Sequence, residues 1–364
     1  MNSIRKAKDI ALKENLDLSE EEKTILGVIR SLELRPKDPK TGETIISDEM
    51  KIKATKDGII AFGSLRFKEQ MANCAVLLEL LVQKKFLHFD GQIYSLTDPG
   101  RRIGKNVRTK WLSQIYDDTL VRSAESRAHA LFCQRVFGKN LCQYNVMDMD
   151  QLETMLETLN LQSTDYVLDL GCGLGKITEY IATRTGARVL GIDFAEKVIH
   201  WAQTHTDSLD GKLAFQVGDM NDLALPLSTF DGIIAIDTLY PVNLESLEAT
   251  ISKIKDLLKS TGQMGIFYAQ YQSPTESSDI LKSKNTEMAK ALTKSRLSFK
   301  TIDFTENART IWHRELAVAQ ELREMFEKEG NLDLCEERIE QSKNLIKRFD
   351  NHQQRRYFYH VQLE

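Results

Sequence analysis

Residues 166–176 read Tyr-Val-Leu-Asp-Leu-Gly-Cys-Gly-Leu-Gly-Lys and join an apolar run to three glycines. Val167 to Leu170 predicts a short buried parallel strand, and the apolar spacing from Ile177 onward predicts a helix. The glycines between them allow a sharp turn and let a ligand approach the main chain without meeting a Cβ atom. Free N–H groups at the start of the helix favour a polar or anionic ligand group. The segment is therefore predicted to be a strand, a ligand-binding turn and a helix.

Spacing separates this turn from two other glycine-rich loops. A dinucleotide-binding loop has the pattern Gly-x-Gly-x-x-Gly, but Lys176 occupies the third glycine position here. A nucleotide P-loop has four residues between its glycines, whereas three residues separate Gly171 from Gly175 and Ile177 follows the lysine. The pattern that fits is Asp-x-Gly-x-Gly-x-Gly, from Asp169 to Gly175. It resembles motif I of the class I S-adenosylmethionine-dependent methyltransferases.

The rest of the chain follows the order expected of that family. Apolar or β-branched segments predict six more strands, at Arg188–Ile192, Leu213–Val217, Phe230–Asp237, Gln263–Tyr268, Phe299–Phe304 and Arg355–Gln362. Helical segments alternate with the earlier strands, which predicts right-handed crossovers and places ligands at the carboxyl ends of the strands. We expect an α/β fold with a doubly wound, seven-stranded, mostly parallel sheet of the Rossmann-like methyltransferase type.

The resemblance implies S-adenosylmethionine as the cofactor, S-adenosylhomocysteine as the product, and no metal. Asp169 would face the amino group of the donor, and Asp193 would accept hydrogen bonds from two ribose hydroxyls. Asp219 would accept from the adenine amino group, with Met220 against the ring. For each acid, a helix N-cap or turn role is the alternative. The expected cofactor-binding residues are Tyr144, Asp169, Gly171, Cys172, Gly173, Gly175, Asp193, Phe194, Asp219, Met220 and Asp237.

Tyr144 lies in the segment that folds across the donor in related enzymes. Its aromatic face would close over the sulfonium of the donor. Alternatively, its ring packs the junction between two helices, which are predicted at Val121–Phe137 and Met149–Leu159.

Residues for the methyl acceptor are fewer. Asp237-Thr-Leu-Tyr240 lies where many nucleic-acid amine methyltransferases carry an Asn-Pro-Pro-Tyr motif, and the missing prolines argue against methylation of a base or a glutamine amide. Tyr240, Tyr268 and Tyr271 are expected to line the mouth of the acceptor pocket. His313 is the candidate base, with a solvent-facing histidine as the alternative. The candidate catalytic residues are therefore Asp237, Tyr240 and His313.

Residues 1–110 are predicted to form a separate winged-helix-like domain. Ser19 and Glu22 form a possible capping box, a helix is expected at Lys68–Lys85, and Leu87–Leu96 is expected to be a hairpin with a two-residue turn. In methyltransferases such a module serves dimerisation and covers the substrate. The apolar circumference of the helix at 68–85 favours burial over reading of DNA bases. The basic cluster at 101–110 leaves nucleic-acid contact open, with a solvated helix face as the alternative.

The remaining sequence divides into two parts. Residues 111–160 are expected to form a helical linker that covers the cofactor, and residues 161–364 the S-adenosylmethionine-binding methyltransferase domain. An insertion at 305–354 predicts a helical lid, with helices at Asn307–Lys328 and Leu332–Phe349 separated by Gly330. Glu315 and Arg338 on these helices could pair with a charged substrate, or they could be solvated.

Composition restricts the class of protein. The net charge of −4 over 364 residues argues against a dedicated nucleic-acid binder, which usually carries a basic excess. Five cysteines without a Cys-x-x-Cys pair indicate neither a zinc site nor a disulfide framework. Residues 1–15 are charged and helical in pattern, without the apolar segment of a signal peptide, and no apolar run is long enough to span a membrane. We expect a soluble, cytoplasmic protein.

These features predict an enzyme that transfers a methyl group from S-adenosylmethionine to a small-molecule acceptor by in-line displacement. The accepting atom could be N, O, S or C. A homodimer is expected. The alternatives are an RNA or protein methyltransferase, a DNA-binding regulator that senses S-adenosylmethionine, and a protein that uses the donor for another transfer.

Overall fold

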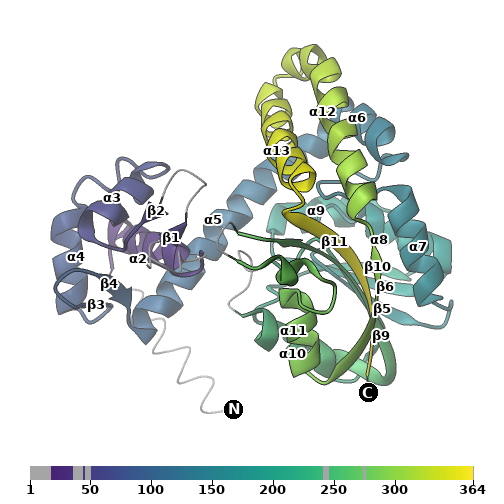
Figure 1. Cartoon of the computed structure of the whole chain (residues 1–364), viewed down its shortest axis with the longest axis horizontal. Coiled ribbons are helices and arrows are strands. Elements are labelled where there is room, and N and C mark those ends of the chain that lie inside the picture. Colours follow the sequence, from purple (N-terminus) through teal and green to yellow (C-terminus); the bar gives the residue numbers. More distant parts are fainter. Residues whose placement is uncertain (1–17, 36–43, 46–50, 241–245, 274–275, 364) are drawn as a thin grey trace. The chain divides into compact units, whose positions relative to one another are not determined.

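The computed structural model describes residues 18–35, 44–45, 51–240, 246–273 and 276–363, and it divides into two compact units, Met1–Leu112 and Ser113–Glu364 (Figure 1). The charged segment expected to be helical at residues 1–15 lies outside the described residues. Helix α5 (Asp98–Glu125) contains the division between the two units.

The first unit is a small helical domain with a hairpin. Its elements are α2 (Glu20–Glu33), β1 (Thr44–Ile45), β2 (Lys51–Ile52), α3 (Lys56–Ser64), α4 (Cys74–Gln83), β3 (Leu87–Phe89) and β4 (Tyr94–Leu96), followed by the start of α5. The expected capping box of α2 is confirmed, because the Ser19 hydroxyl accepts from Glu22 N and the Glu22 carboxylate accepts from Ser19 N. Ile25, Ile29 and Leu78 are among the residues that form its fully buried core.

Two local predictions in this unit are wrong. The helix expected from Lys68 begins at Cys74, because residues before it form turns, one of them closed by a bond from Met71 N to Phe67 O. Only one side of this helix is buried, and Val76 is 69% exposed. The hairpin pairs Phe89 with Tyr94 and so has a four-residue loop. The Asp90 carboxylate stabilises this wider loop by accepting from the N–H groups of residues 92 and 93. The winged-helix resemblance stays a prediction.

The second unit contains the expected sheet. Its strands are β5 (Tyr166–Leu170), β6 (Arg188–Asp193), β7 (Leu213–Val217), β8 (Phe230–Ile236), β9 (Leu258–Tyr271), β10 (Leu297–Asp303) and β11 (Gln354–Leu363). The strand order is β10-β11-β9-β8-β5-β6-β7, and only β11 runs antiparallel to its neighbours. The prediction of a doubly wound, mostly parallel seven-stranded sheet is confirmed.

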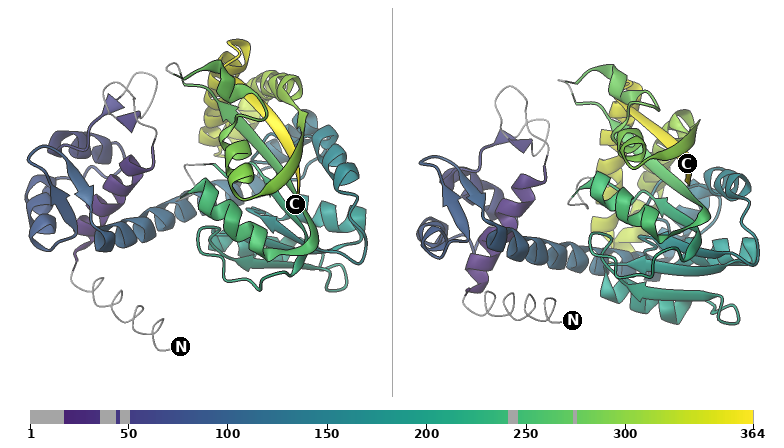
Figure 2. Two further views of the ribbon diagram at one scale, coloured as in Figure 1. Left: turned by 60° about the horizontal axis from the view of Figure 1, so that its bottom comes forward. Right: turned by 90° about the horizontal axis from the view of Figure 1, so that it is seen from below.

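Helices cover both faces of this sheet (Figure 1, Figure 2). On one face, α7 (Met149–Leu159) and α8 (Lys176–Thr185) pack on a core that includes Val167 and Ile234. On the other, α10 (Leu247–Leu257) and α11 (Glu287–Lys294) pack on Leu168 and Ile233. Successive strand residues thus face opposite cores, as expected for strands buried on both sides. Helix α9 (Glu196–His205) completes the unit beside β6 and β7.

A helical group lies at the carboxyl edge of the sheet. Helices α12 (Thr305–Lys328) and α13 (Leu332–Asp350) leave from the end of β10 and return to the start of β11, and they pack with α6 (Arg127–Phe137) around a shared apolar core. The helix expected at 121–137 is interrupted at Ser126, whose hydroxyl accepts from His129 N and donates to the Glu329 carboxylate. The insertion at 305–354 is helical as expected, and Gly330 adopts φ +73° between its helices.

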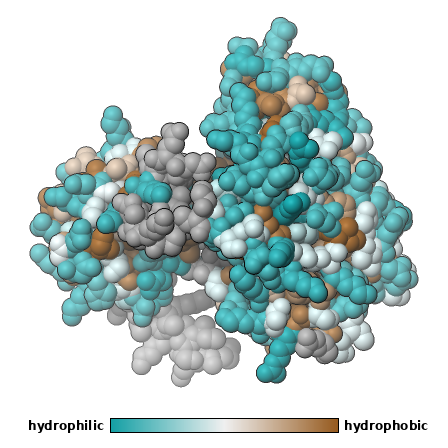
Figure 3. Space-filling model, in the orientation of Figure 1, coloured by the Kyte–Doolittle hydropathy of each residue, from teal (hydrophilic) through white to brown (hydrophobic). Residues whose placement is uncertain are grey.

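The face of the second unit that Figure 3 shows is mostly hydrophilic, with scattered apolar side chains. Over the described ranges, no helix combines the length and the apolar character that a membrane span requires. In the same part of the chain, no cluster of three or more His, Cys, Asp or Glu residues is arranged to hold a metal ion.

Candidate functional site

The candidate site lies where the parallel strands end. Because β5, β6, β7 and β8 run in the same direction, the residues that follow them meet at one edge of the sheet. These are the glycine loop after β5, Asp193 at the end of β6, Asp219 after β7 and Asp237 after β8. Strand β5 lies between β6 and β8, so the edge includes the point where the strand order reverses, which is the usual ligand position in such sheets.

Glycine is needed at the three loop positions for different structural reasons. All have positive φ, at +73° for Gly171, +52° for Gly173 and +73° for Gly175. A Cβ atom on Gly171 would lie 2.3 Å from Thr238 Cγ2, and one on Gly175 would lie 2.5 Å from the Phe215 ring. A Cβ atom on Gly173 would meet nothing within 4 Å. Gly173 therefore presents main chain to open space, and this opening is the candidate cradle for a ligand.

Cys172 contributes its backbone and a small packed side chain. Its Sγ lies 2.9 Å from the position that a Cβ atom on Gly191 would occupy. Burial raises the pKa of the thiol well above its ordinary value. The thiol is therefore a packing group on β6 and stays protonated.

Asp169 is buried beneath the loop at 2% exposure. Its Oδ2 accepts a hydrogen bond of 2.6 Å from the Thr178 hydroxyl. Burial raises its pKa to about 6, and the nearby charge of Asp193 acts in the same direction. A cationic group near the loop would favour the ionised form of this carboxyl.

Asp193 bridges the glycine loop and the turn into α9. Its Oδ2 accepts from Gly173 N at 3.1 Å and its Oδ1 accepts from Ala195 N at 3.0 Å. Burial raises its pKa, against the effect of these backbone N–H groups. The next residue, Phe194, meets Tyr116 edge to face with ring centroids 5.6 Å apart. Asp193 therefore stabilises a turn, which was the alternative to ligand binding, and it also lies beside the open cradle.

Asp219 forms a local turn after β7. Its Oδ1 accepts from both the backbone N and the side-chain Nδ2 of Asn221, each at 2.8 Å. Met220 is half-buried and packs against the core on the α10 and α11 face. Gly218 N donates to Asp193 O, which ties this turn to the end of β6.

Asp237 is engaged by protein groups on both carboxylate oxygens, which does not favour the expected catalytic role. The Arg356 guanidinium donates to Oδ1 at 2.5 Å and to Oδ2 at 2.9 Å. The Tyr240 hydroxyl also donates to Oδ1, and Val146 N donates to Oδ2 at 3.4 Å. Four donors leave this carboxylate little capacity to accept a proton from a substrate.

The tyrosines expected at the pocket mouth are mostly structural. Tyr268 is 2% exposed, and its hydroxyl donates to Glu287 of α11, so it is a core residue rather than a lining residue. Tyr240 stacks on it with centroids 5.2 Å apart, and its hydroxyl accepts from Ala269 N. Burial raises the pKa of both phenols above the ordinary range. Tyr271 has the Arg348 guanidinium over its ring at 4.3 Å.

His313 occupies a half-exposed position on α12. Its Nε2 lies 3.7 Å from Asp350, which also pairs with Arg309. Over the described residues, no hydrogen bond or ion pair joins it to Asp237 or Tyr240. The solvent-facing alternative fits this position better, and a role as base stays a prediction.

Tyr144 is held by α13 on two sides. The Arg338 guanidinium lies 4.0 Å from its ring centroid, and its hydroxyl donates to Glu337. The ring belongs to one apolar cluster with Leu174 of the glycine loop and Ala195 of the next turn. Tyr144 therefore joins the helical insertion to the candidate cradle.

Glu315 and Arg338 are buried, at 0% and 3% exposure, so the expectation of solvated side chains is wrong. They face each other, with Arg338 Nη1 3.7 Å from Glu315 Oε2. Among the described residues, neither carboxylate oxygen of Glu315 has a hydrogen-bond partner. Burial raises the pKa of Glu315 to about 7, against the effect of Arg338.

Sequence reasoning missed Arg356 and Asp117. Arg356 lies inside the predicted last strand, where a charged residue at a buried position signals a partner. Asp117 of α5 accepts from Lys197 N and Val198 N at the start of α9. No local signal marks it, because its partners lie about 80 positions away.

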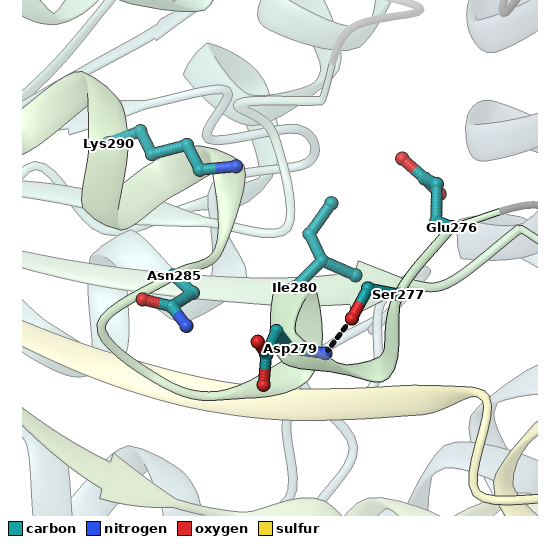
Figure 4. A pocket seen from close by; sticks show the side chains of 6 residues that line it. All are labelled: Glu276, Ser277, Asp279, Ile280, Asn285 and Lys290. Carbon is teal, nitrogen blue, oxygen red and sulfur yellow. Dashed lines mark hydrogen bonds between the residues drawn. The ribbon is translucent and has the colours of Figure 1, made fainter. Parts of the chain in front are cut away.

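A separate hollow of about 300 Å³ opens beside α11 and the segment that joins β9 to it (Figure 4). It is lined by Glu276, Ser277, Asp279, Ile280, Asn285 and Lys290, most of which are exposed. The hollow contains none of the expected site residues, and its charges are mixed. It is a surface feature rather than the chemical centre.

Comparison with known proteins agrees with this geometry. Residues 167–262 match the family described as a methyltransferase domain. A sterol 24-C-methyltransferase of Gibberella zeae is 35% identical over 103 residues, 28% of this chain and 27% of that protein. A phosphoethanolamine N-methyltransferase of Plasmodium falciparum is 27% identical over 129 residues, 35% of this chain and 47% of that protein. The chain therefore spans less than half the length of these relatives.

Two solved structures show the fold. Phosphoethanolamine N-methyltransferase 2 of Haemonchus contortus, in complex with phosphomonomethylethanolamine and S-adenosylhomocysteine, has a TM-score of 0.55 at 15% identity. The match covers 68% of this chain and 60% of that one. The (4+2)-cyclase SpnF has a TM-score of 0.53 at 15% identity, over 70% of this chain and 96% of that one. The second unit has the Rossmann-like fold of class I methyltransferases.

Proposed function

We propose that the methyltransferase domain binds S-adenosylmethionine on the Gly173 loop and transfers its methyl group to a small-molecule acceptor. The observation that carries the proposal is the open main chain at Gly173, between the buried carboxyls of Asp169 and Asp193 at the reversal point of the sheet.

The charges of these residues fit this donor. S-adenosylmethionine carries an ammonium and a sulfonium, both cationic. Burial raises the pKa of Asp169 and of Asp193, so each carboxylate lacks solvation that a cationic ligand would replace. We expect Asp169 to face the ammonium, Asp193 the ribose, and the turn of Asp219 and Met220 the adenine. The bound donor would supply an activated methyl group.

The chain's own contribution to the reaction is binding and alignment. Transfer from a sulfonium requires the acceptor atom about 3 Å from the methyl carbon and in line with the sulfur. The four donors on Asp237 argue that this residue holds the site together rather than removing a proton. An acceptor that is nucleophilic without deprotonation by Asp237 is therefore favoured.

The acceptor could be methylated on N, O, S or C. The domain match and the relatives support methyl transfer, but the same fold occurs in a cyclase. Because fold similarity alone does not decide how the donor is used, methyl transfer has to be measured directly. RNA or protein substrates, and sensing of the donor by a regulator, are the other candidate functions.

We propose that the first unit forms the contact between two copies of the chain and helps to cover the substrate. The basis is its separate core and the exposed Val76 of α4. Sedimentation of the whole chain would show a dimer if this is correct. A cytoplasmic location stays a prediction.

Titration calorimetry tests the donor site. S-adenosylmethionine and S-adenosylhomocysteine would be titrated into the wild type, an Asp193→Ala variant and an Asp150→Ala control, whose aspartate is exposed on α7. We expect micromolar binding by the wild type and the control, and loss of binding by Asp193→Ala. No binding by wild type, with or without cell extract to supply an acceptor, would contradict the proposal. If the wild type binds the donor, transfer of a labelled methyl group to a metabolite in the extract would identify the reaction.

A further inference from the structure

Helix α9 begins without a capping side chain of its own. Its N-cap residue is Ala195, which has no side chain able to accept a hydrogen bond. The N–H groups of Lys197 and Val198, the second and third helical residues, are those that an N-cap side chain normally serves. Both donate to Oδ1 of Asp117, at 2.8 Å and 3.1 Å. The cap of α9 therefore comes from α5, about 80 positions earlier in the sequence.

This borrowed cap changes the role of Asp193. Asp193 lies two residues before the N-cap residue of α9, and a carboxylate there can bond N–H groups at the first turn of a helix that has no cap of its own. Because Asp117 already satisfies that turn, Asp193 directs one oxygen to Gly173 N and the other to Ala195 N. Its carboxylate thus stays beside the open glycine of the candidate cradle.

Two neighbours of Asp117 contact the same turn. Tyr116 meets Phe194 edge to face, and Leu120 shares an apolar cluster with Leu174 and Ala195. Asp117 itself is 7% exposed, and Ser113 Oγ lies 3.4 Å from its second oxygen. One face of α5 therefore holds the turn between β6 and α9 by a hydrogen-bonded charge and by apolar contacts on either side.

The charge of Asp117 also acts on Asp193. The groups that face Asp193 are Asp117 from α5, Asp169 from β5 and the thiol of Cys172 in the loop. The Cys172 thiol stays protonated and carries no charge, and the carboxylate whose charge raises the pKa of Asp193 is that of Asp117. Removal of the charge at Asp117 would lower the pKa of Asp193.

We infer that Asp117 is a positioning residue for the donor site: by capping α9 from α5, it leaves the Asp193 carboxylate directed at the ligand. This inference names a further residue of the site in the proposed function and depends on that function only for the identity of the ligand. The second half of α5 thus also contributes to the site, although nothing in its sequence indicates this role.

The test uses two substitutions of Asp117 and a neighbouring control in the whole chain. Asp117→Asn keeps an acceptor oxygen for the cap but removes the charge, and Asp117→Ala removes both. Asp118→Ala alters the adjacent aspartate, whose side chain is 65% exposed and pairs with Arg122. Affinity for S-adenosylmethionine would be measured by calorimetry from about pH 5 to about pH 8, beside the thermal midpoint. The pKa of Asp193 would be followed by carbon NMR without ligand.

We expect Asp117→Ala to weaken donor affinity about tenfold and to lower the thermal midpoint. Asp117→Asn should keep the thermal midpoint, lower the pKa of Asp193, and move the loss of affinity on acidification to lower pH. Asp118→Ala should change none of these. An Asp117→Ala variant that loses stability but keeps its affinity within twofold would overturn the inference, because the cap would then be structural only.

The two proposals fail in different ways. If the wild type binds no donor, the proposed function fails, and the NMR titration still tests the link between Asp117 and Asp193. An unchanged Asp193 pKa in Asp117→Asn would overturn the inference even if the donor binds.

Discussion

Asp237 and Arg356 form a two-pronged ion pair across 119 positions of the sequence, with N–O distances of 2.5 Å and 2.9 Å. The pair joins the end of β8 to β11, and both side chains are shielded from water, at 10% and 2% exposure. Arg356 Nε also donates to Gln151 of α7, whose amide donates in turn to Val146 O. One buried guanidinium thus fixes three segments around the carboxyl edge of the sheet.

Removing this guanidinium is expected to destabilise the fold strongly. Arg356→Met should lower the free energy of unfolding by about 3–5 kcal/mol, because it leaves the Asp237 carboxylate without its counter-charge. Arg135→Met breaks an exposed ion pair with Glu321 and should cost far less, because water solvates and salt screens both groups. Urea denaturation measures both. Equal losses in the two variants would show that the buried pair is not a special source of stability.

The open side of Gly173 predicts a variant that folds but does not bind. Gly173→Ala meets no neighbouring atom and should cost only about 1–2 kcal/mol for its φ of +52°. The added methyl group would occupy the cradle, so we expect donor affinity to fall more than tenfold, by about 1.4 kcal/mol or more.

Gly330→Ala is the matched control for this strain. Gly330 has φ +73° and equally open surroundings, but it lies between α12 and α13. Its alanine variant should lose similar stability and keep donor binding. Donor binding by both variants would be measured by calorimetry. Normal binding by Gly173→Ala would contradict the proposed position of the cradle.

Glu315 predicts an unusual dependence of stability on pH. Its pKa is raised from 4.5 to about 7 in the folded chain, so between these values the folded state keeps a proton that the unfolded state releases. Stability should therefore fall as the pH rises through this window, by about 3 kcal/mol in total. Glu315→Gln should reduce this fall, and the exposed Glu157→Gln on α7 should not. Urea denaturation at about pH 5 and about pH 8 measures the difference. If the stability of Glu315→Gln decreased with pH as much as that of the wild type, the decrease would belong to other groups.

Substitutions of Tyr144 decide between its two interpretations. Tyr144→Phe keeps the ring beneath Arg338 and loses only the bond to Glu337, so donor affinity should stay within about twofold. Tyr144→Ala removes the ring, and we expect affinity to fall about tenfold if the ring covers the donor. A lower thermal midpoint with unchanged affinity would instead mean that the ring only packs the helix junction.

The sheet could be predicted because its strands are buried on both faces. Such strands are apolar runs that end at a glycine or an acid, and the strand expected at Phe230–Asp237 differs from β8 by one residue at its end. The glycine loop and Asp193 followed from their places at strand ends.

Features that depend on distant partners could not be predicted in the same way. The helix break at Ser126 interrupts an apolar pattern and depends on Glu329, 203 positions away. Likewise, the partners of Asp237 and Glu315 could not be predicted, because Arg356 and Arg338 reach them only in the folded chain. Local sequence shows which residues are charged, but tertiary packing determines which of those charges are neutralised.

The antiparallel strand β11 has a consequence for the growing chain on the ribosome. A nascent chain that has reached residue 300 contains β5 to β9 but lacks Arg356, so the Asp237 carboxylate has no counter-charge. The edge of β9 that β11 later covers is then still open to pairing with other chains. Synthesis must continue for more than 50 further residues before β11 closes that edge. The carboxyl edge that is proposed to hold the donor is thus completed late in translation, and this interval is when the chain most needs protection from misassembly.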